Sequence, residues 1–399
     1  MGKIKNVVVV GLGYIGLPTA AIIAKNNISV TGIDINENIV ETINKGKIHI
    51  VEPELVGLVK SVVDKKNLKA ATKPVKADVF VIAVPTPFRG KHKPDISFVE
   101  KATISIIPFL KEGNIYILES TSPIGTTDKM AKLIYKKRPE LKNKIAIAYC
   151  PERVLPGNVI HELVNNDRVI GGIDSYSTTK ACEFYGLFVK GELHQTNART
   201  AEMCKLTENS YRDLNIAFAN ELSIICDKAG INVWELITLA NKHPRVKILQ
   251  PGTGVGGHCI AVDPWFIVSD FAEEAVMIKN ARERNLFKTQ WVIEKVKSAI
   301  TSFKGKPVIA FMGLAFKPDI DDLRESPAIE VVEHFTKSNH ENILIVEPNV
   351  LNYHNLKLTN FTEAYNKADI IVFLVAHKEF KSLPKNSAKV ELDFCGVRK

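Results

Sequence analysis

A cysteine in a glycine-rich segment is the residue of this chain best suited to covalent chemistry. Residues 250–259 read Gln-Pro-Gly-Thr-Gly-Val-Gly-Gly-His-Cys, so four glycines expose the backbone beside one thiol. Asp263 and Pro264 follow, a pair that predicts an N-cap with proline in the first helical turn. A helix N-terminus lowers the pKa of a nearby thiol and favours the nucleophilic thiolate. We therefore expect Cys259 to be a nucleophile, with His258 structural or beside the substrate.

A long predicted helix carries a second group of polar residues. Thr200 to Lys228 contains neither proline nor glycine, and its apolar residues recur at helical spacing. Lys205, Asn209 and Arg212 fall at i, i+4 and i+7, which puts them on one face. A lysine and an amide one turn apart can hold an oxygen whose charge changes during a reaction. A solvated polar face is the alternative for such a triplet on its own.

A glycine motif near the N-terminus predicts a dinucleotide site. The strand-like run Val7–Val10 leads into Gly11, Gly13 and Gly16, and Asp34 follows 18 residues after the last glycine. The glycines allow a tight turn and bring backbone N–H groups close to a pyrophosphate at a helix N-terminus. A carboxylate at the position of Asp34 accepts hydrogen bonds from the adenosine ribose and repels a 2′-phosphate. This pattern predicts NAD rather than NADP.

Two further loops follow predicted strands. Val84–Phe88 and Glu119–Pro123 leave the carboxyl ends of strands, where open α/β sheets bind their ligands. Each carries a hydroxyl group, and we expect Thr86 and Thr121 to lie near the nicotinamide half of the cofactor. Turn formation alone is the simpler role for these residues.

Apolar runs of strand length alternate with amphipathic stretches, which predicts parallel sheets with crossover helices. The first set of strands is expected at Val7–Val10, Val30–Ile33, Val79–Val84, Ile115–Leu118 and Ile145–Tyr149, and the second at Val308–Met312, Ile343–Val346 and Ile370–Ala376. Helical sequence lies between them, from Thr200 to Lys228 and from Trp265 to Ser302. We predict an α/β fold of two Rossmann-like parallel-sheet domains joined by a long central helical region, with domains at residues 1–196, 197–302 and 303–399.

Composition excludes several classes of protein. The 399 residues are 45% hydrophobic and 24% charged, which argues against disorder. No apolar run approaches the roughly 18 residues of a membrane span, and the N-terminus lacks the pattern of a signal peptide, so we expect a cytoplasmic protein without a membrane partner.

Cysteine spacing and charge narrow the partners further. The six cysteines are scattered without a C-x-x-C pair, which predicts reduced thiols and neither a disulfide framework nor a metal site. The formal charge is +9, yet the lysines alternate with carboxylates, which argues against nucleic acid and suits an anionic small substrate.

Six motifs carry a resemblance to a known family. They are GLGYIGLP at Gly11–Pro18, SPIGTT at Ser122–Thr127, CPERVLPG at Cys150–Gly157, the run Arg199–Leu222, GVGGHCIAVDPWF at Gly254–Phe266 and GLAFKPDIDDLRESPA at Gly313–Ala328. Through them the chain resembles the UDP-glucose/GDP-mannose dehydrogenase family over essentially its full length. PERVLPG, HPRV at His243–Val246 and GGHCIAVDPWF are most similar to the branch that acts on UDP-N-acetylhexosamines.

The resemblance implies a four-electron oxidation of the sugar C6 alcohol to a carboxylate, with two NAD used in succession at one site. UDP-N-acetyl-D-mannosamine is the expected substrate, and the product would serve surface polysaccharide biosynthesis. The Cys259 thiolate would form a thiohemiacetal and then a thioester that water hydrolyses. The other catalytic positions that the resemblance implies are Lys205 and Asn209 for the oxyanions, Asp263 and Glu152 for water and proton transfer, and Thr121 near the reacting carbon.

The resemblance also implies binding residues and an assembly. Substrate contacts would fall on Glu152, Arg153, Val154, Lys205, Asn209, Arg212, His243, Arg245, Gly256 and Lys317, and cofactor contacts on Gly11, Gly13, Tyr14, Ile15, Gly16, Asp34, Thr86, Thr121 and Arg324. Arginine can hold a diphosphate bidentately, which gives the positive charge a purpose. Pro156 stands where UDP-glucose dehydrogenases carry a second glutamate, so glucose is disfavoured. The family further implies a homodimer built on the central helix, the middle domain holding the cysteine loop and dimer contacts and the last domain binding the UDP-sugar.

Three alternatives stay open. The same chemistry could act on UDP-N-acetyl-D-glucosamine, which differs only at C2. A two-electron hydroxyacid dehydrogenase also pairs a dinucleotide domain with a long helix bearing Lys-x-x-x-Asn, and it needs no cysteine. A non-catalytic protein that binds NAD and a nucleotide sugar is the third.

Overall fold

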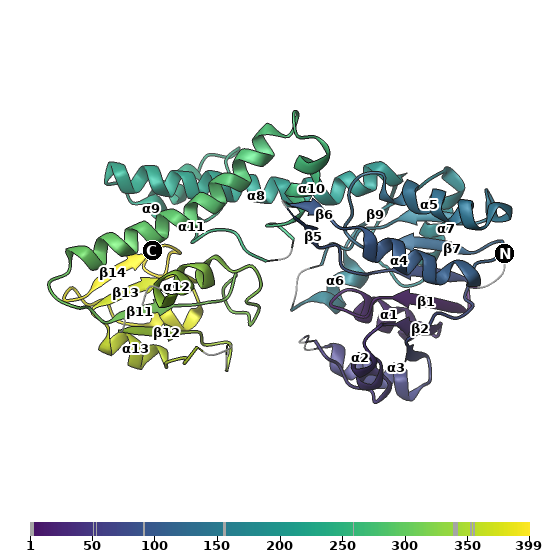
Figure 1. Ribbon diagram of the computed structural model, residues 1–399, viewed down its shortest axis with the longest axis horizontal. Helices are drawn as coiled ribbons and strands as arrows, with labels where there is room; N and C mark the ends of the chain where they lie inside the picture. The colour runs from purple at the N-terminus through teal and green to yellow at the C-terminus, as the bar shows by residue number, and fades with distance from the viewer. Residues whose placement is uncertain are drawn as a thin grey trace. The chain divides into compact units, whose positions relative to one another are not determined.

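The computed structural model describes residues 4–50, 52, 54–90, 92–154, 157–257, 259–337, 342–351, 353 and 356–399. The chain divides into two compact units, Met1–Thr207 and Glu208–Lys399. Each unit holds a sheet covered by helices (Figure 1). The predicted architecture of two α/β sheets with helical sequence between them is confirmed.

The first unit is built on an eight-stranded sheet within the described residues, in the order β10-β9-β8-β7-β4-β1-β2-β3. Its strands are β1 Asn6–Val10, β2 Ser29–Ile33, β3 Leu68–Ala71, β4 Val79–Ile82, β7 Ile115–Leu118, β8 Ala146–Tyr149, β9 Arg168–Gly172 and β10 Leu193–Asn197. Chain order reverses between β1 and β4, which pair in parallel on opposite sides of that point. Open α/β sheets bind ligands at such a switch point, outside the carboxyl ends of the strands.

Both faces of this sheet are buried, which explains its continuous apolar runs. Val7 and Val9 face a core with α1, α3, α6 and α7, whereas Val8 and Val10 face a core with α4 and α5. Burial of each such side chain stabilises the fold by about 1.5–3 kcal/mol. The helices are α1 Gly16–Lys25, α2 Glu37–Asn44, α3 Leu55–Asp64, α4 Ser97–Ile106, α5 Thr126–Lys137, α6 Val159–Asn165 and α7 Ser175–Tyr185, with short 3₁₀ turns η1 Ile107–Phe109 and η2 Pro139–Leu141 and a hairpin of β5 Phe88–Arg89 and β6 Lys93–Pro94.

The second unit has a four-stranded parallel sheet in the order β12-β11-β13-β14 within the described residues. Its strands are β11 Ile309–Met312, β12 Ile343–Val346, β13 Ile370–Phe373 and β14 Val390–Asp393. One face packs on α11 Val276–Ser302 and α12 Pro327–Lys337, and the other on α13 Phe361–Lys367 and η3 Lys378–Ser382. The remaining helices are α9 Val233–Ala240 and α10 Asp263–Asp270.

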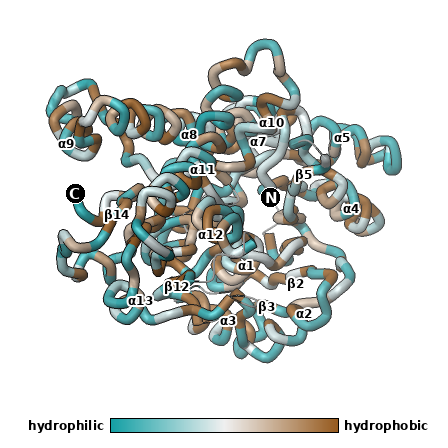
Figure 2. Tube along the Cα trace, turned by 60° about the vertical axis from the view of Figure 1, so that its left-hand side comes forward, coloured by the Kyte–Doolittle hydropathy of each residue, from teal (hydrophilic) through white to brown (hydrophobic). Residues whose placement is uncertain are grey.

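The long helix predicted from Thr200 to Lys228 is confirmed as α8, Ala198–Ala229. Its apolar and polar residues alternate along the length, as do those of α11 (Figure 2). The second predicted helix, Trp265–Ser302, is wrong in one respect, because residues 271–275 form a turn between α10 and α11. That turn, Phe-Ala-Glu-Glu-Ala, contains no glycine or proline, so the sequence carries no local sign of the break.

Candidate active site

The turn after β1 has the geometry of a dinucleotide site. Gly11 has φ +93°, and a Cβ there would lie 2.5 Å from the Ala83 carbonyl oxygen. A Cβ on Gly16 would lie 1.8 Å from the carbonyl oxygen of Gly11, so neither position accepts a side chain. Gly13, in contrast, is exposed and faces open space within 4 Å. A side chain at residue 13 would therefore meet no other part of the protein. It would, however, keep a pyrophosphate from lying against the backbone, so a glycine here fits a site for NAD.

Asp34 closes this turn from the end of β2. Its Oδ2 accepts the N–H of Leu12 at 3.1 Å, and its Oδ1 accepts the N–H of Asn36 at 2.9 Å. The carboxylate is only partly buried, as a group that reads a ribose must be. Tyr14 is exposed and Ile15 half-buried beside it, in the loop where they were predicted.

The two loops predicted to flank the nicotinamide lie together. The Thr86 hydroxyl donates to the Thr121 carbonyl oxygen at 2.7 Å, which joins the loop after β4 to the loop after β7. Both loops leave carboxyl ends of strands beside the switch point. The sequence therefore identified neighbours across 35 residues of chain.

A buried acid that the sequence analysis did not single out anchors the second loop. Glu202 of α8 is fully buried, and its carboxylate accepts the N–H of Gly125 at 2.5 Å, the N–H of Thr127 at 2.8 Å and the Thr127 hydroxyl at 2.7 Å. These N–H groups belong to the start of α5, so a carboxylate of the protein itself fills that helix N-terminus. Because Glu202 lies three residues before Lys205, the loop of Thr121 is tied to the helix turn that carries the predicted catalytic lysine.

Glu152 lies in a buried charged cluster. Its Oε2 pairs with Arg168 at 2.7 Å, and its Oε1 accepts the N–H of Arg153 at 2.6 Å. Arg168 also donates to the Leu163 carbonyl oxygen and lies over the ring of Tyr185 at 5.4 Å. The Glu152 carboxylate is therefore held rigidly at the end of β8.

Tyr185 links this cluster to a second buried acid. Its hydroxyl donates to Glu119 Oε1 at 2.6 Å, and Glu119 follows β7 two residues before Thr121. Burial raises the pKa of Glu119 to about 7, with a further rise from Glu152 and opposition from Arg168 and the Tyr185 hydroxyl. The cluster therefore joins the loop after β7, which carries Thr121, to the loop after β8, which carries Glu152.

The second unit brings three predicted catalytic residues together. Cys259 is exposed, and its carbonyl oxygen accepts the N–H of Asp263 at 2.8 Å in the turn that begins α10. Asn209 of α8 donates from Nδ2 to Asp263 Oδ2 at 2.6 Å, and both side chains are buried. Asp263 is the first residue of α10 rather than its N-cap, a difference of one residue. All six cysteines lie in the described part of the chain, and among them Cys259 alone is exposed.

The glycines before Cys259 have a packing role that the sequence did not reveal. A Cβ on Gly254 would lie 2.5 Å from the Thr289 hydroxyl, and one on Gly256 would lie 2.4 Å from the Glu325 carbonyl oxygen. Gly257 has φ +82° and donates its N–H to the Arg324 carbonyl oxygen at 3.2 Å. The glycines therefore let the cysteine segment lie against residues 316–327 of the same unit.

The predicted substrate cations remain available for an anion. Lys205, Arg212, Arg245 and Lys317 have side chains without an ion pair or hydrogen bond in the described part of the chain. Arg212, Arg245 and Lys317 are also exposed. Arg324, by contrast, donates from Nε and Nη2 to the carboxylate of Asp322. Of the other predicted contacts, Arg153 and Val154 are half-buried beside Glu152, and His243 is exposed two residues before Arg245. His258 and Pro156 are outside the described residues.

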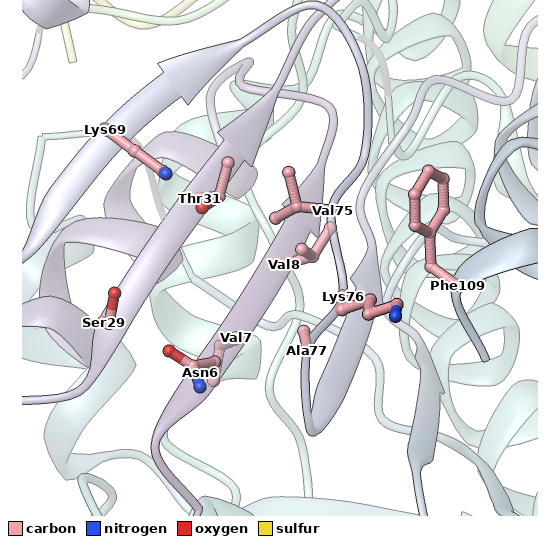
Figure 3. Close-up of a pocket in the computed structure, with 10 residues that line it drawn as sticks. All are labelled: Asn6, Val7, Val8, Ser29, Thr31, Lys69, Val75, Lys76, Ala77 and Phe109. Carbon is pink, nitrogen blue, oxygen red and sulfur yellow. The ribbon is translucent and has the colours of Figure 1, made fainter. Parts of the chain in front are cut away.

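A cavity of about 490 Å³ in the first unit has none of the predicted site residues in its lining (Figure 3). Its lining includes Asn6 and Ser29, which begin β1 and β2, and Ala77, which precedes β4. This is the amino edge of the sheet, opposite the edge that carries the glycine turn, so the cavity is no part of the cofactor site. Within the described residues, no helix has both the length and the apolar character needed to cross a membrane.

The fold and the glycine turn define a dinucleotide-dependent oxidoreductase with a second α/β domain. Family models for the UDP-glucose/GDP-mannose dehydrogenases match the chain at residues 5–189 (NAD binding domain), 199–286 (central domain) and 310–397 (UDP binding domain). The chain belongs to this family of NAD-dependent dehydrogenases, and the predictions of family and cofactor are confirmed.

Named relatives are similar over nearly the whole chain. A UDP-N-acetyl-D-mannosamine dehydrogenase of Campylobacter jejuni is 56% identical over 99% of this chain and 100% of its own length. An NDP-N-acetyl-D-galactosaminuronic acid dehydrogenase of Ralstonia nicotianae is 51% identical, over 98% of this chain and 96% of its own length. The solved UDP-D-ManNAc dehydrogenase of Pyrococcus horikoshii superposes with a TM-score of 0.91 at 38% identity, covering 99% of this chain and 96% of that one.

Proposed function

We propose that this protein oxidises UDP-N-acetyl-D-mannosamine at C6 to UDP-N-acetyl-D-mannosaminuronate, a precursor for surface polysaccharide. The observation that carries the proposal is the exposed Cys259 thiol beside the buried Asn209–Asp263 pair. A two-electron alcohol dehydrogenase has no use for a nucleophile there, whereas an oxidation that continues from aldehyde to acid does. The 56% identical relative named for this sugar supports the choice of substrate.

The net reaction converts the CH₂OH group, two NAD⁺ and one water into a carboxylate, two NADH and three protons. Bound NAD supplies the hydride acceptor for both oxidations. The Cys259 sulfur forms a bond to C6 at the aldehyde level, giving a thiohemiacetal, and keeps that bond as the carbon reaches the thioester level. Water then breaks the C–S bond and restores the thiol, so the cysteine ends the cycle unchanged.

The remaining residues bind, orient and move protons. Lys205 and Asn209 stabilise the oxyanion that develops on the sugar oxygen, because a cation and an oriented amide dipole act where charge appears. Asp263, oriented by the Asn209 amide, accepts a proton in the hydrolysis. Thr121 lies near the reacting carbon. Glu152 orients water for the hydrolysis from a fixed position, because its two oxygens accept hydrogen bonds from the Arg153 N–H and from Arg168.

Binding follows the same division. The Gly11–Gly16 turn, Asp34, Thr86, Thr121 and Arg324 hold NAD, and the diphosphate and sugar are held by Arg153, Val154, Arg212, His243, Arg245, Gly256 and Lys317. Arg212, Arg245 and Lys317 support this assignment, because their side chains make no ion pair or hydrogen bond within the described part of the chain and are not already neutralised. Residues 1–196, 197–302 and 303–399 then serve as cofactor, central and UDP-sugar domains.

An exposed stripe on α8 supports the proposed homodimer, and the cysteines support the proposed location. Tyr211, Phe218 and Ile225 of α8 recur every seven residues and are 67%, 49% and 54% exposed. An exposed apolar stripe at this spacing supports a homodimer formed through α8, as in helix pairs with a seven-residue repeat. A cytoplasmic location suits an enzyme that uses NAD and keeps six free thiols.

The test is the amount of NADH formed per sugar nucleotide when the sugar is limiting. UDP-N-acetyl-D-mannosamine should give two NADH, and its glucosamine and galactosamine epimers little turnover. One NADH per sugar would favour the two-electron dehydrogenase, and preference for another epimer would move the proposal to that sugar. No turnover of any of them would leave a binding protein.

A cysteine variant separates the two chemistries. Cys259→Ser should lose at least about 10³-fold of the steady-state rate, because serine at neutral pH is not ionised and its ester analogue forms slowly. Cys204→Ser is the matched control, since this half-buried thiol lies on α8 one residue before Lys205. Full two-NADH turnover by Cys259→Ser would contradict the thioester route.

A further inference from the structure

One buried carboxylate holds the turn that follows β11. Glu347 follows β12, and its Oε2 accepts the N–H of Leu314 at 2.8 Å and the N–H of Ala315 at 2.9 Å. Asp34 occupies the same place in the first unit, at the end of the second strand and bonded to the turn after the first. Unlike Asp34, Glu347 is buried. It therefore fixes the turn rather than facing a ligand.

A histidine holds the other end of the same turn. His377 is fully buried, and its Nδ1 accepts the N–H of Asp319 at 3.0 Å. Its Nε2 lies 3.1 Å from Glu347 Oε2. A backbone N–H can only donate, so the hydrogen-bond pattern assigns the ring proton to Nε2, which donates to Glu347. The pair thus spans the turn from residue 314 to residue 319.

Charge and backbone conformation fit this role. Burial raises the pKa of Glu347, but its contacts with His377, Asn349 and Leu314, the His377 hydrogen bond foremost, lower the pKa overall. Asp319 has φ +61°, in the left-handed region that costs about 1 kcal/mol outside glycine. Its Oδ1 accepts the N–H of Lys378 at 3.0 Å, which ties this residue to the loop after β13.

Lys317 is the side chain that this fixed turn exposes. It lies between Ala315 and Asp319, is exposed, and makes no ion pair or hydrogen bond with the described residues. The neighbouring Phe316 ring packs against Gly257, where a Cβ would approach the ring to 2.9 Å. The turn is therefore held at both ends and packed against the segment that leads to Cys259.

We propose that His377 is a positioning residue for the UDP-sugar, which with Glu347 fixes residues 314–319 so that the Lys317 ammonium meets the substrate's diphosphate. The inference rests on the proposed function. Asp319 and Glu379 lie close to His377, as in a metal site. His377 does not bind a cation there, because its Nδ1 accepts hydrogen bonds from the N–H groups of Asp319 and Asn349.

Two replacements of His377 in the full chain separate the hydrogen bonds at Nδ1 from the hydrogen bond at Nε2. In His377→Asn the amide oxygen replaces Nδ1 and can still accept the N–H of Asp319. In His377→Gln the amide nitrogen replaces Nε2 and can still donate to Glu347, but the acceptor for Asp319 is lost. We expect His377→Gln to raise KM for the UDP-sugar about tenfold and His377→Asn to change it less than about threefold. KM for NAD should be unchanged in both.

A double-mutant cycle with Lys317→Met tests whether the effect passes through the lysine. If His377 acts by positioning Lys317, His377→Gln should add no further rise in KM for the UDP-sugar in the Lys317→Met background. Additive effects, or equal effects of the Asn and Gln variants, would overturn the inference. An unchanged KM in Lys317→Met alone would instead remove Lys317 from the proposed function.

A third variant tests the same turn if replacement of the buried histidine prevents folding. Asp319→Gly keeps the left-handed backbone and removes the carboxylate that accepts from Lys378. It should raise KM for the UDP-sugar several-fold with KM for NAD constant. An unchanged KM for the UDP-sugar would contradict the positioning role.

Discussion

The carboxyl group of Glu119 lies at the end of β7, closed off from solvent and bonded to the Tyr185 hydroxyl. Its second oxygen, Oε2, is buried without a hydrogen-bond partner in the described structure. A neutral carboxylic acid is the form that such surroundings favour, and burial raises its pKa to about 7. Glu119 therefore changes charge near neutral pH, directly behind the loop that carries Thr121.

The pH dependence of stability should reveal this acid. Glu119 has a higher pKa folded than unfolded, so its contribution is fully present below about pH 4.5 and is lost as pH rises through about 7. Glu119→Gln keeps the neutral shape and removes the titration. Between pH 5 and pH 8 the wild type should lose on the order of 3 kcal/mol relative to the variant, measured from thermal unfolding midpoints. Parallel pH profiles for the two proteins would contradict the buried acid.

At the level of single residues, the sequence predicted the positions of residues that stand next to a recognisable strand or helix signal. The glycine turn, Asp34 and the exposed Cys259 lie where strand and helix signals placed them. Arg168, Glu202 and His377 could not be found in this way, because each acts on backbone or side chains far along the chain. In the sequence, a charged residue that is buried in the fold cannot be distinguished from one that lies on the surface.

At the level of elements, α5 shows how a helix end is stabilised by another helix. Gly125, before its first turn, has φ +83° and no side chain to cap the helix, so the carboxylate of Glu202 supplies the acceptor instead. Burial raises the pKa of Glu202 despite these hydrogen bonds. A carboxylate that bonds several N–H groups at a helix N-terminus stabilises it beyond an ordinary hydrogen bond.

Replacing that carboxylate should weaken both the fold and the reaction. Glu202→Gln presents an NH₂ group to N–H donors, so we expect a loss of about 1–3 kcal/mol in unfolding free energy and a lower kcat at unchanged KM for NAD. Glu183→Gln, which removes an exposed pair with Lys180 on α7, should cost less than about 0.5 kcal/mol. Equal stability of the two variants in urea unfolding would contradict the capping role.

Strands that are continuous apolar runs were predicted, and strands without such a run were missed. The predicted strands β1, β4, β7 and β8 are buried on both faces of the sheet, which is why their apolar runs are continuous. The missed edge strand β10 reads Leu-His-Gln-Thr-Asn and is largely exposed, and β9, which carries two glycines, runs antiparallel to β8. Edge strands take their structure from a neighbour, so their own sequence indicates little.

At the level of the whole molecule, the stripe of Tyr211, Phe218 and Ile225 predicts self-association. If the proposed homodimer forms through this stripe, Phe218→Asp with Ile225→Asp should lower the molecular mass from that of a dimer to that of a monomer, because charges would replace apolar side chains in the contact. Val56→Asp, at a half-exposed apolar residue of α3, should leave the dimer intact. Sedimentation equilibrium measures both. A dimer that survives the double replacement would exclude α8 as its contact.

The inward carboxylate of Glu347 also has a consequence for the order of events in turnover. Each unit has a turn after the first strand of its sheet, and an acid bonds to that turn. In the first unit this acid, Asp34, is partly exposed and can accept hydrogen bonds from a ribose. In the second unit the acid, Glu347, is buried and already accepts N–H groups of the protein. The proposed four-electron oxidation would then have a single place for its oxidant. Under that proposal the first NADH departs and a fresh NAD⁺ arrives while the half-oxidised sugar stays bound through Cys259, so cofactor exchange, rather than chemistry, would be the step at which an aldehyde could escape.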